Sequence, residues 1–221
     1  MPDNNSSIIF SRGDIYSREI ALTYDCGVER GYAAEILEVL KTHEVRATFF
    51  ITGEWAEKNA DLSQRIVSEG HEIGNHSYNH SDLTKLSLED LIRQIAEADN
   101  AIYKVTRERP RPLFRLPFGS YSRQVLYILR EMGYEYCVHW SLEIQDFRRR
   151  TASSIANQIL QNVRNGDVIL MNALGKGTAE ASGLAVPELK KQGYGFVTVG
   201  NMLQKTNEMR FGKRQINMNR A

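Results

Sequence analysis

The chain has 221 residues, 42% hydrophobic and 25% charged, and its 28 basic and 27 acidic side chains leave a formal net charge of +1. This length allows one well-buried core, and the charge balance excludes a protein that binds nucleic acid by neutralising many phosphates. No apolar run approaches the ~20 residues that span a bilayer, and the start of the chain lacks the basic and apolar segments of a signal peptide. We expect one globular domain with no membrane span.

Seven short apolar segments predict strands. They are residues 19–24, 47–51, 71–74, 113–116, 136–140, 167–171 and 195–199. Amphipathic segments between them predict helices, most clearly at 33–44, 87–105, 122–133 and 151–163. Ser87 and Asp90 are typical of a helix start, and Gly133 of a helix end. Strand-helix alternation with no internal linker predicts a parallel α/β domain.

The alternation is compatible with an open doubly wound sheet and with a (β/α) barrel. No GxGxxG or GxxxxGK[ST] motif follows a strand, which removes the phosphate-binding loops typical of the open sheet. We expect residues 1–16 to form an N-terminal extension, residues 17–203 the domain, and residues 204–221 a polar tail or surface helix.

Residues capable of chemistry lie at or after the ends of five predicted strands. They are Asp25 with Cys26, His76 with His80, Arg115, Asp146 and Asn172. In a barrel, all would meet at the rim formed by the carboxyl ends of the strands. Histidines at i and i+4 lie on one side of a helical turn, so the two imidazoles can converge on one cation. A carboxylate or thiolate from another loop would complete a hydrolytic metal centre.

Each pair also has a simpler interpretation. An HxxxH pair in a polar segment can be two surface or hydrogen-bonded histidines. Asp25 and Cys26 can be a turn-capping aspartate beside a buried thiol. The only two cysteines, Cys26 and Cys137, are too few for a disulfide scaffold and do not indicate a redox compartment.

Five motifs favour the functional interpretation of these residues over the simpler one. They are LTYDCG (22–27), HSYNHS (76–81), RLPFG (115–119), WSLEIQDF (140–147) and GDVILMN (166–172). In order and spacing they resemble the motifs of the polysaccharide deacetylase family with the NodB homology domain, carbohydrate esterase family 4. The resemblance covers roughly residues 17–203. It implies a distorted (β/α) barrel of seven parallel strands that removes N-acetyl groups from peptidoglycan or chitin-like glycans, with a bacterial, extracellular or cell-surface location.

The resemblance also implies a catalytic and a metal-binding set. Asp25 resembles the general base, and Arg115 with Asp146 resembles the pair that orients and tunes this base. His76 and His80 resemble the imidazole ligands of a divalent metal.

A further set would bind substrate. The backbone N–H of Phe118, which follows Pro117, matches the donor that stabilises the oxyanion. Leu170 resembles the residue that lines the pocket for the acetyl methyl group. Outside this substrate-binding set, Ser77 resembles the residue that positions the histidine loop.

Two residues depart from the family's motifs. Cys26 occupies the position of a metal-ligand aspartate; a thiolate is a competent zinc ligand and favours Zn²⁺ as the cofactor, and a buried, non-ligating thiol is the alternative. Asn172 occupies the position of the histidine that protonates the leaving amine, which an amide cannot do near neutral pH. Glu143, His139 or the protonated form of Asp25 are alternative donors.

Three functions therefore stay open. The first is a metal-dependent deacetylase with impaired or altered catalysis. The second is a catalytically inactive relative that binds glycan or acts in regulation. The third is an amidohydrolase that acts on a non-sugar amide.

Overall fold

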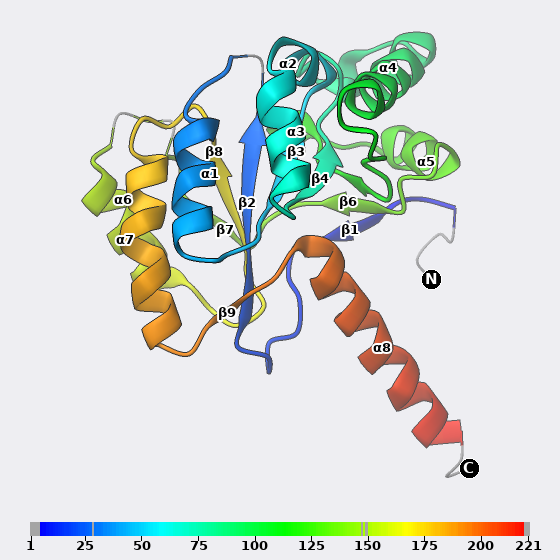
Figure 1. The fold of residues 1–221 in the computed structure, drawn as a ribbon. Helices are drawn as coiled ribbons and strands as arrows, with labels where there is room; N and C mark the ends of the chain where they lie inside the picture. The colour runs from blue at the N-terminus through cyan, green and yellow to red at the C-terminus, as the bar shows by residue number, and fades with distance from the viewer. Residues whose placement is uncertain (1–4, 28, 147, 149, 219–221) are drawn as a thin grey trace.

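The computed structural model describes residues 5–27, 29–146, 148 and 150–218, with the backbone alone for 209–218. Residues 1–4 of the expected extension and 219–221 of the expected tail lie outside the described residues. The chain folds into a curled sheet covered by helices (Figure 1). The strands are β1 (Ile8–Phe10), β2 (Glu19–Cys26), β3 (Thr48–Ile51), β4 (Glu72–Asn75), β5 (Leu113–Phe114), β6 (Tyr136–Val138), β7 (Leu142–Glu143), β8 (Val168–Asn172) and β9 (Gly195–Phe196).

Neighbouring strands of this sheet pair in parallel, in the order β1-β6-β5-β4-β3-β2-β8-β7, and β9 adds to β2. The predicted (β/α) barrel is confirmed. Nine strands are present among the described residues instead of seven, because β1 and β7 join the sheet. These strands of three and two residues lie outside the seven segments that the sequence predicts.

The barrel is distorted where β6 leads into β7. The backbone N–H of His139 donates to the carbonyl of Phe10 in β1, and that of Ser141 donates to the carbonyl of Val168 in β8. Residues 139–141 thus connect the two sides of the sheet. The carboxyl ends of β2 to β8 share one rim, which brings the five motifs together.

The helices are α1 (Ala33–Thr42), α2 (Gly53–Lys58), α3 (Ala60–Ser68), α4 (Leu88–Thr106), α5 (Arg123–Glu131), α6 (Ala152–Asn162), α7 (Thr178–Lys191) and α8 (Val199–Met218), with 3₁₀ turns η1 (Leu83–Lys85) and η2 (Pro117–Gly119). The hydroxyl of Ser87 accepts a hydrogen bond from the N–H of Asp90, which confirms the predicted start of α4. The sequence pattern does not indicate α7, which contains Pro187. In Figure 1, α8 projects away from the barrel. None of the helices in the described ranges has the length and apolar character needed to cross a bilayer.

The longest strand, β2, separates two hydrophobic clusters. Leu22, Tyr24 and Cys26 belong to the cluster shared with α1 and α7, outside the sheet. Ala21 belongs to a second cluster, which the first turns of α8 complete. Because side chains alternate along a strand, Asp25 faces the same side as Ala21, toward the inside of the barrel.

Candidate active site

A cavity of about 610 Å³ opens at the carboxyl ends of the strands. It is lined by six predicted site residues, namely Asp25, His76, His80, Phe118, Leu170 and Asn172, and by Gly27, Glu29, Leu116, Trp140, Glu143 and Leu174. Glu29, Leu116 and Leu174 were not predicted as site residues. Their only signal is position, because each lies within a motif or two residues beyond one.

An ion pair holds Asp25 in place. Nη1 of Arg115 lies 2.8 Å from Oδ1 of Asp25 and also donates to the hydroxyl of Thr23 at 2.8 Å. The Arg115 side chain is fully buried, whereas Asp25 is 11% exposed. Burial lowers the pKa of Arg115, and the charge of Asp25 opposes this shift. The pair is mutually dependent, since removing either member leaves a buried charge without its partner.

Arg115 is itself immobilised. Its Nε donates to the carbonyl of Val138 at 3.1 Å and its Nη2 to the carbonyl of His139 at 3.2 Å. The guanidinium carbon also lies 4.0 Å from the centre of the Phe50 ring. A guanidinium fixed on all sides gives Asp25 one orientation, which is the geometry that an orienting role for Arg115 requires.

His76 presents an unpaired nitrogen to the cavity. Its Nδ1 lies 2.7 Å from the carbonyl oxygen of Arg115, and because a carbonyl only accepts, Nδ1 carries the proton. Nε2 is buried without a hydrogen-bond partner in the described part of the chain, 3.6 Å from Oδ2 of Asp25. Burial lowers the pKa of His76, so the ring is neutral. A neutral imidazole held through its other nitrogen is typical of a metal ligand.

His80 lies against His76, with ring centroids 4.8 Å apart. The prediction of a helical turn is wrong: the segment is a loop in which Ser77 and His80 adopt left-handed φ angles of 68° and 63°. The two left-handed residues, and not helical periodicity, bring the rings together. Burial, and next the neighbouring His76, lower the pKa of His80 to about 4. Both imidazoles are therefore neutral at pH 7.

Cys26 does not line the cavity that the two histidines share. It ends β2 on the side opposite Asp25 and is fully buried in the cluster formed with α1 and α7. Burial, and next the charge of Asp25, raise the pKa of the Cys26 thiol well above its usual value. Its contacts within this cluster are those of a packing side chain.

The residues present fit a divalent cation in part. Two neutral imidazoles face the cavity, and Nε2 of His76 is unpaired. Within the described ranges, no group of three or more His, Cys, Asp or Glu side chains is placed to hold a metal ion. Among the described residues, the two histidines predicted as ligands thus have no third His, Cys, Asp or Glu side chain grouped with them to hold a metal.

Asp146 hydrogen-bonds to Asn172, and in the described part of the chain no hydrogen bond joins it to Asp25 or Arg115. Its carboxylate accepts hydrogen bonds from the backbone N–H of Asn172 (2.8 Å), from Nδ2 of Asn172 (3.0 Å) and from the hydroxyl of Thr178 (2.6 Å). Burial raises the pKa of Asp146, and these hydrogen bonds oppose the shift. These hydrogen bonds place the Asp146 carboxylate beside position 172.

The three predicted substrate-binding residues occupy different places. Phe118 has a φ angle of 60°, its side chain is exposed, and its ring packs edge-on against His80 with centroids 4.8 Å apart. Leu170 is buried and lines the cavity. Pro117 is buried at the start of η2 and does not line the cavity. Its contribution is to begin the turn that carries Phe118.

The candidate proton donors differ in whether they line the cavity. Glu143 and Asp25 line the cavity, whereas His139 does not. The His139 ring stacks on Trp140 with centroids 5.4 Å apart, and its Nε2 is buried without a hydrogen-bond partner among the described residues. Of the donors other than the base, Glu143 is thus the one that faces the substrate space.

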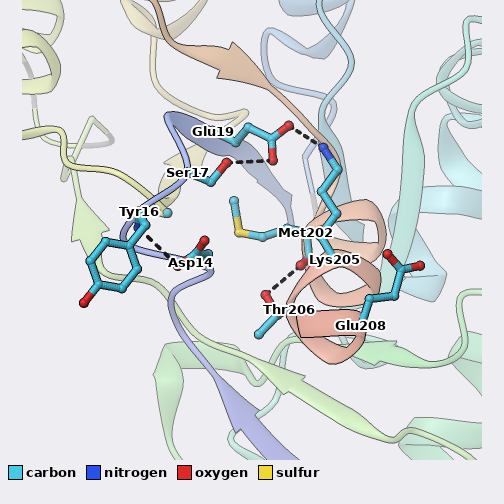
Figure 2. Close-up of a pocket in the computed structure, with 9 residues that line it drawn as sticks. Asp14, Tyr16, Ser17, Glu19, Met202, Lys205, Thr206 and Glu208 are labelled. Carbon is cyan, nitrogen blue, oxygen red and sulfur yellow. Dashed lines mark hydrogen bonds and ion pairs between the residues drawn. The ribbon is translucent and has the colours of Figure 1, made fainter. Parts of the chain in front are cut away.

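A second cavity, of about 600 Å³, lies at the opposite end of β2, against α8 (Figure 2). Several of its polar groups pair with one another: Glu19 accepts a hydrogen bond from Ser17 and forms an ion pair with Lys205, and the Asp14 carboxylate accepts from the N–H of Tyr16. It contains none of the five motifs' reactive residues. The candidate active site is therefore the cavity at the carboxyl ends of the strands.

Comparisons with known proteins show which proteins the chain is similar to. The sequence profile described as polysaccharide deacetylase matches residues 13–137. The peptidoglycan-N-acetylmuramic acid deacetylase PdaA of Bacillus subtilis is 32% identical over 197 residues, 88% of this chain and 74% of that protein. Its solved structure superposes with a TM-score of 0.84 at 31% identity, covering 91% of this chain and 86% of the other. A peptidoglycan-N-acetylglucosamine deacetylase of Bacillus cereus is 34% identical over 200 residues, 89% of this chain and 72% of that protein.

A CE4 family pseudoenzyme from Bacillus anthracis also shares the fold. Its structure superposes with a TM-score of 0.83 at 29% identity, covering 90% of this chain and 69% of the other. A mutant of it described as having restored enzymatic activity has the same TM-score. The family profile covers more than half of this chain, and the deacetylases cover most of it, so the protein belongs to the polysaccharide deacetylase family.

Proposed function

We propose that the protein removes N-acetyl groups from peptidoglycan at a bacterial cell wall. One observation carries this proposal: Oδ2 of Asp25, in a carboxylate fixed by Arg115, lies 3.6 Å from the buried, unpaired Nε2 of His76. A proton acceptor is thus held beside a free imidazole nitrogen in a cavity. The peptidoglycan deacetylases among the relatives support an N-acetylated glycan as the substrate.

The cavity residues suit hydrolysis of an amide. His76 and His80 would hold a divalent cation, which supplies a Lewis acid when bound. Asp25 would accept the proton of the attacking water at Oδ2, and the backbone N–H of Phe118 would donate to the developing oxyanion. Leu170 provides an apolar wall for the acetyl methyl group.

Zinc is the metal we propose. Imidazole nitrogens suit zinc better than they suit magnesium or manganese, which prefer oxygen ligands. A site with two protein imidazoles keeps further positions open to water and substrate.

A glycan-binding role without turnover is the second candidate, and Asn172 favours it. The Asn172 amide donates to Asp146 and cannot protonate a leaving amine. In this case the cavity would hold the glycan chain, and Asp25 would serve only to pair with Arg115.

Metal analysis combined with an acetate-release assay separates these functions. Purified protein should bind about one zinc and release acetate from peptidoglycan, and the Asp25→Asn variant is the negative control. Full zinc loading without acetate from peptidoglycan or chitin oligomers, together with retained glycan binding, would establish the second candidate.

A further inference from the structure

A chain of buried hydrogen bonds leads from α4 to the histidine loop, and none of its outer members lines the cavity. Asp99, Tyr134 and Asn75 are 4%, 1% and 0% exposed. Asp99 lies in α4, Tyr134 precedes β6, and Asn75 ends β4 immediately before His76. Three separate segments of the chain therefore converge behind the loop that carries His76 and His80.

The direction of each hydrogen bond in this chain is determined. The Asp99 carboxylate only accepts, so the Tyr134 hydroxyl donates to its Oδ1 at 2.9 Å. The same hydroxyl oxygen accepts from Nδ2 of Asn75 at 2.7 Å. The amide of Asn75 must therefore turn its Oδ1 the other way, where it accepts the backbone N–H of Ser77 at 2.8 Å.

Arg109 and Arg111 hold the outer end of the chain as a carboxylate. Arg111 donates to Asp99 through Nη2 at 2.7 Å and Arg109 through Nη1 at 2.5 Å. Burial acts to raise the pKa of Asp99, but the hydrogen bonds from Arg111 and Tyr134 outweigh it and the pKa is lowered. Asp99 is therefore an acceptor at neutral pH.

The inner end of the chain reaches His80. Ser77 has a left-handed φ angle, and its hydroxyl accepts the backbone N–H of His80, also left-handed, at 3.1 Å. Such conformations are unfavourable for residues other than glycine and persist only where the surroundings over-determine them. The hydrogen bond from Ser77 to Asn75 supplies part of that constraint.

Helix α4 contacts the same loop a second time. The side-chain carbonyl of Gln94 accepts the backbone N–H groups of Tyr78 and Asn79, both at 3.2 Å. The carbonyl of Ile95 accepts a second hydrogen bond from Nδ2 of Asn75 at 3.3 Å. One helix thus supports both sides of the loop.

We propose that Asp99 and Tyr134 are positioning residues, which act through Asn75 and Ser77 to hold the His76–His80 loop in the conformation that presents both imidazoles to the cavity. The inference rests on the proposed function of these histidines. Residues outside the cavity would then affect how tightly His76 and His80 bind metal, because supporting partners of metal ligands typically contribute about 10- to 100-fold to affinity or activity.

The Tyr134→Phe variant tests this, with Tyr136→Phe as a matched control. Tyr136 is also buried, and its hydroxyl accepts a 2.9 Å hydrogen bond from Asn207, which lies in α8 away from the histidine loop. We expect Tyr134→Phe to weaken zinc binding, measured by competition with a chelator, by about tenfold or more, and to lower kcat with KM unchanged. Tyr136→Phe should leave zinc affinity and kcat at the wild-type level.

Histidine NMR of the metal-free proteins separates this inference from the proposed function. In spectra of ¹⁵N-labelled imidazoles, we expect the His76 and His80 signals to shift in Tyr134→Phe and to stay unchanged in Tyr136→Phe, whether or not the protein is a deacetylase. Asp99→Asn, at the outer end of the chain, provides a second variant if Tyr134→Phe does not fold. Unchanged histidine signals and zinc affinity in a folded Tyr134→Phe or Asp99→Asn variant would overturn the proposal.

Discussion

Asn172, which lines the cavity, is hydrogen-bonded to Asp146 behind it through both its backbone and its side chain. The carboxylate of Asp146 accepts both the backbone N–H and the side-chain Nδ2 of Asn172, at 2.8 and 3.0 Å. The partner that would orient a basic ring at position 172 is therefore in place, although the residue there is an amide.

We expect Asn172→His to increase the rate of acetate release. The imidazole would inherit the hydrogen bond to Asp146, which favours its protonated form, and general acids typically contribute about 10²–10⁴ in rate. A gain of about 10² in kcat, measured on peptidoglycan, would identify proton donation as the limiting step. Asn172→Gln, which cannot donate a proton, is the control and should show no gain.

Asp25→Asn should lower kcat by about 10²–10⁴, the usual contribution of a general base. The amide oxygen can still accept the hydrogen bond from Arg115, so we expect the variant to fold, with lower stability because the buried Arg115 charge loses its counter-charge; circular dichroism can check this. Asp14→Asn, in the other cavity, is the matched control. Equal kcat values for wild type and Asp25→Asn would contradict the assignment of the base.

Cys26→Ala distinguishes a metal ligand from a packing residue. Cys26 and Cys137 are both free and buried in hydrophobic clusters. We expect each Cys→Ala change to cost about 1 kcal/mol in the free energy of unfolding and to leave the zinc content unchanged. A loss of zinc specific to Cys26→Ala would instead support the thiolate ligand that the resemblance implies.

Protein stability should fall as the pH decreases from about 6.5 to about 4. Burial lowers the pKa of His71 from 6.5 to about 4, and its Nδ1 accepts the backbone N–H of Ala47 at 3.2 Å. In that pH range the unfolded chain binds a proton that the folded protein does not, so acidification favours unfolding. Urea denaturation at several pH values should show the free energy of unfolding decreasing from about pH 6.5 to about pH 4. His71→Gln should reduce the slope of this decrease. A slope that is identical in both proteins would exclude His71 as its source.

Much of the architecture was predictable because it depends on local patterns. The seven predicted strands each correspond to an observed strand, and the start of α4 lies at the predicted cap. Residues at strand ends were expected to meet at one rim, and Asp25, His76, His80 and Asn172 do line one cavity. Short β1 and β7, and α7 with its internal proline, have no such local signal.

The sequence by itself determined which residues are candidates for the chemistry and their order along the chain. The tertiary structure decided which way they point and what they contact. Because β2 extends to Cys26 and does not end at Tyr24, strand alternation places Asp25 inside the barrel and Cys26 in the outer cluster. Likewise, Asp146 pairs with Asn172, and left-handed residues shape the histidine loop. Such features depend on hydrogen bonds and packing between distant segments, which only the folded chain brings together.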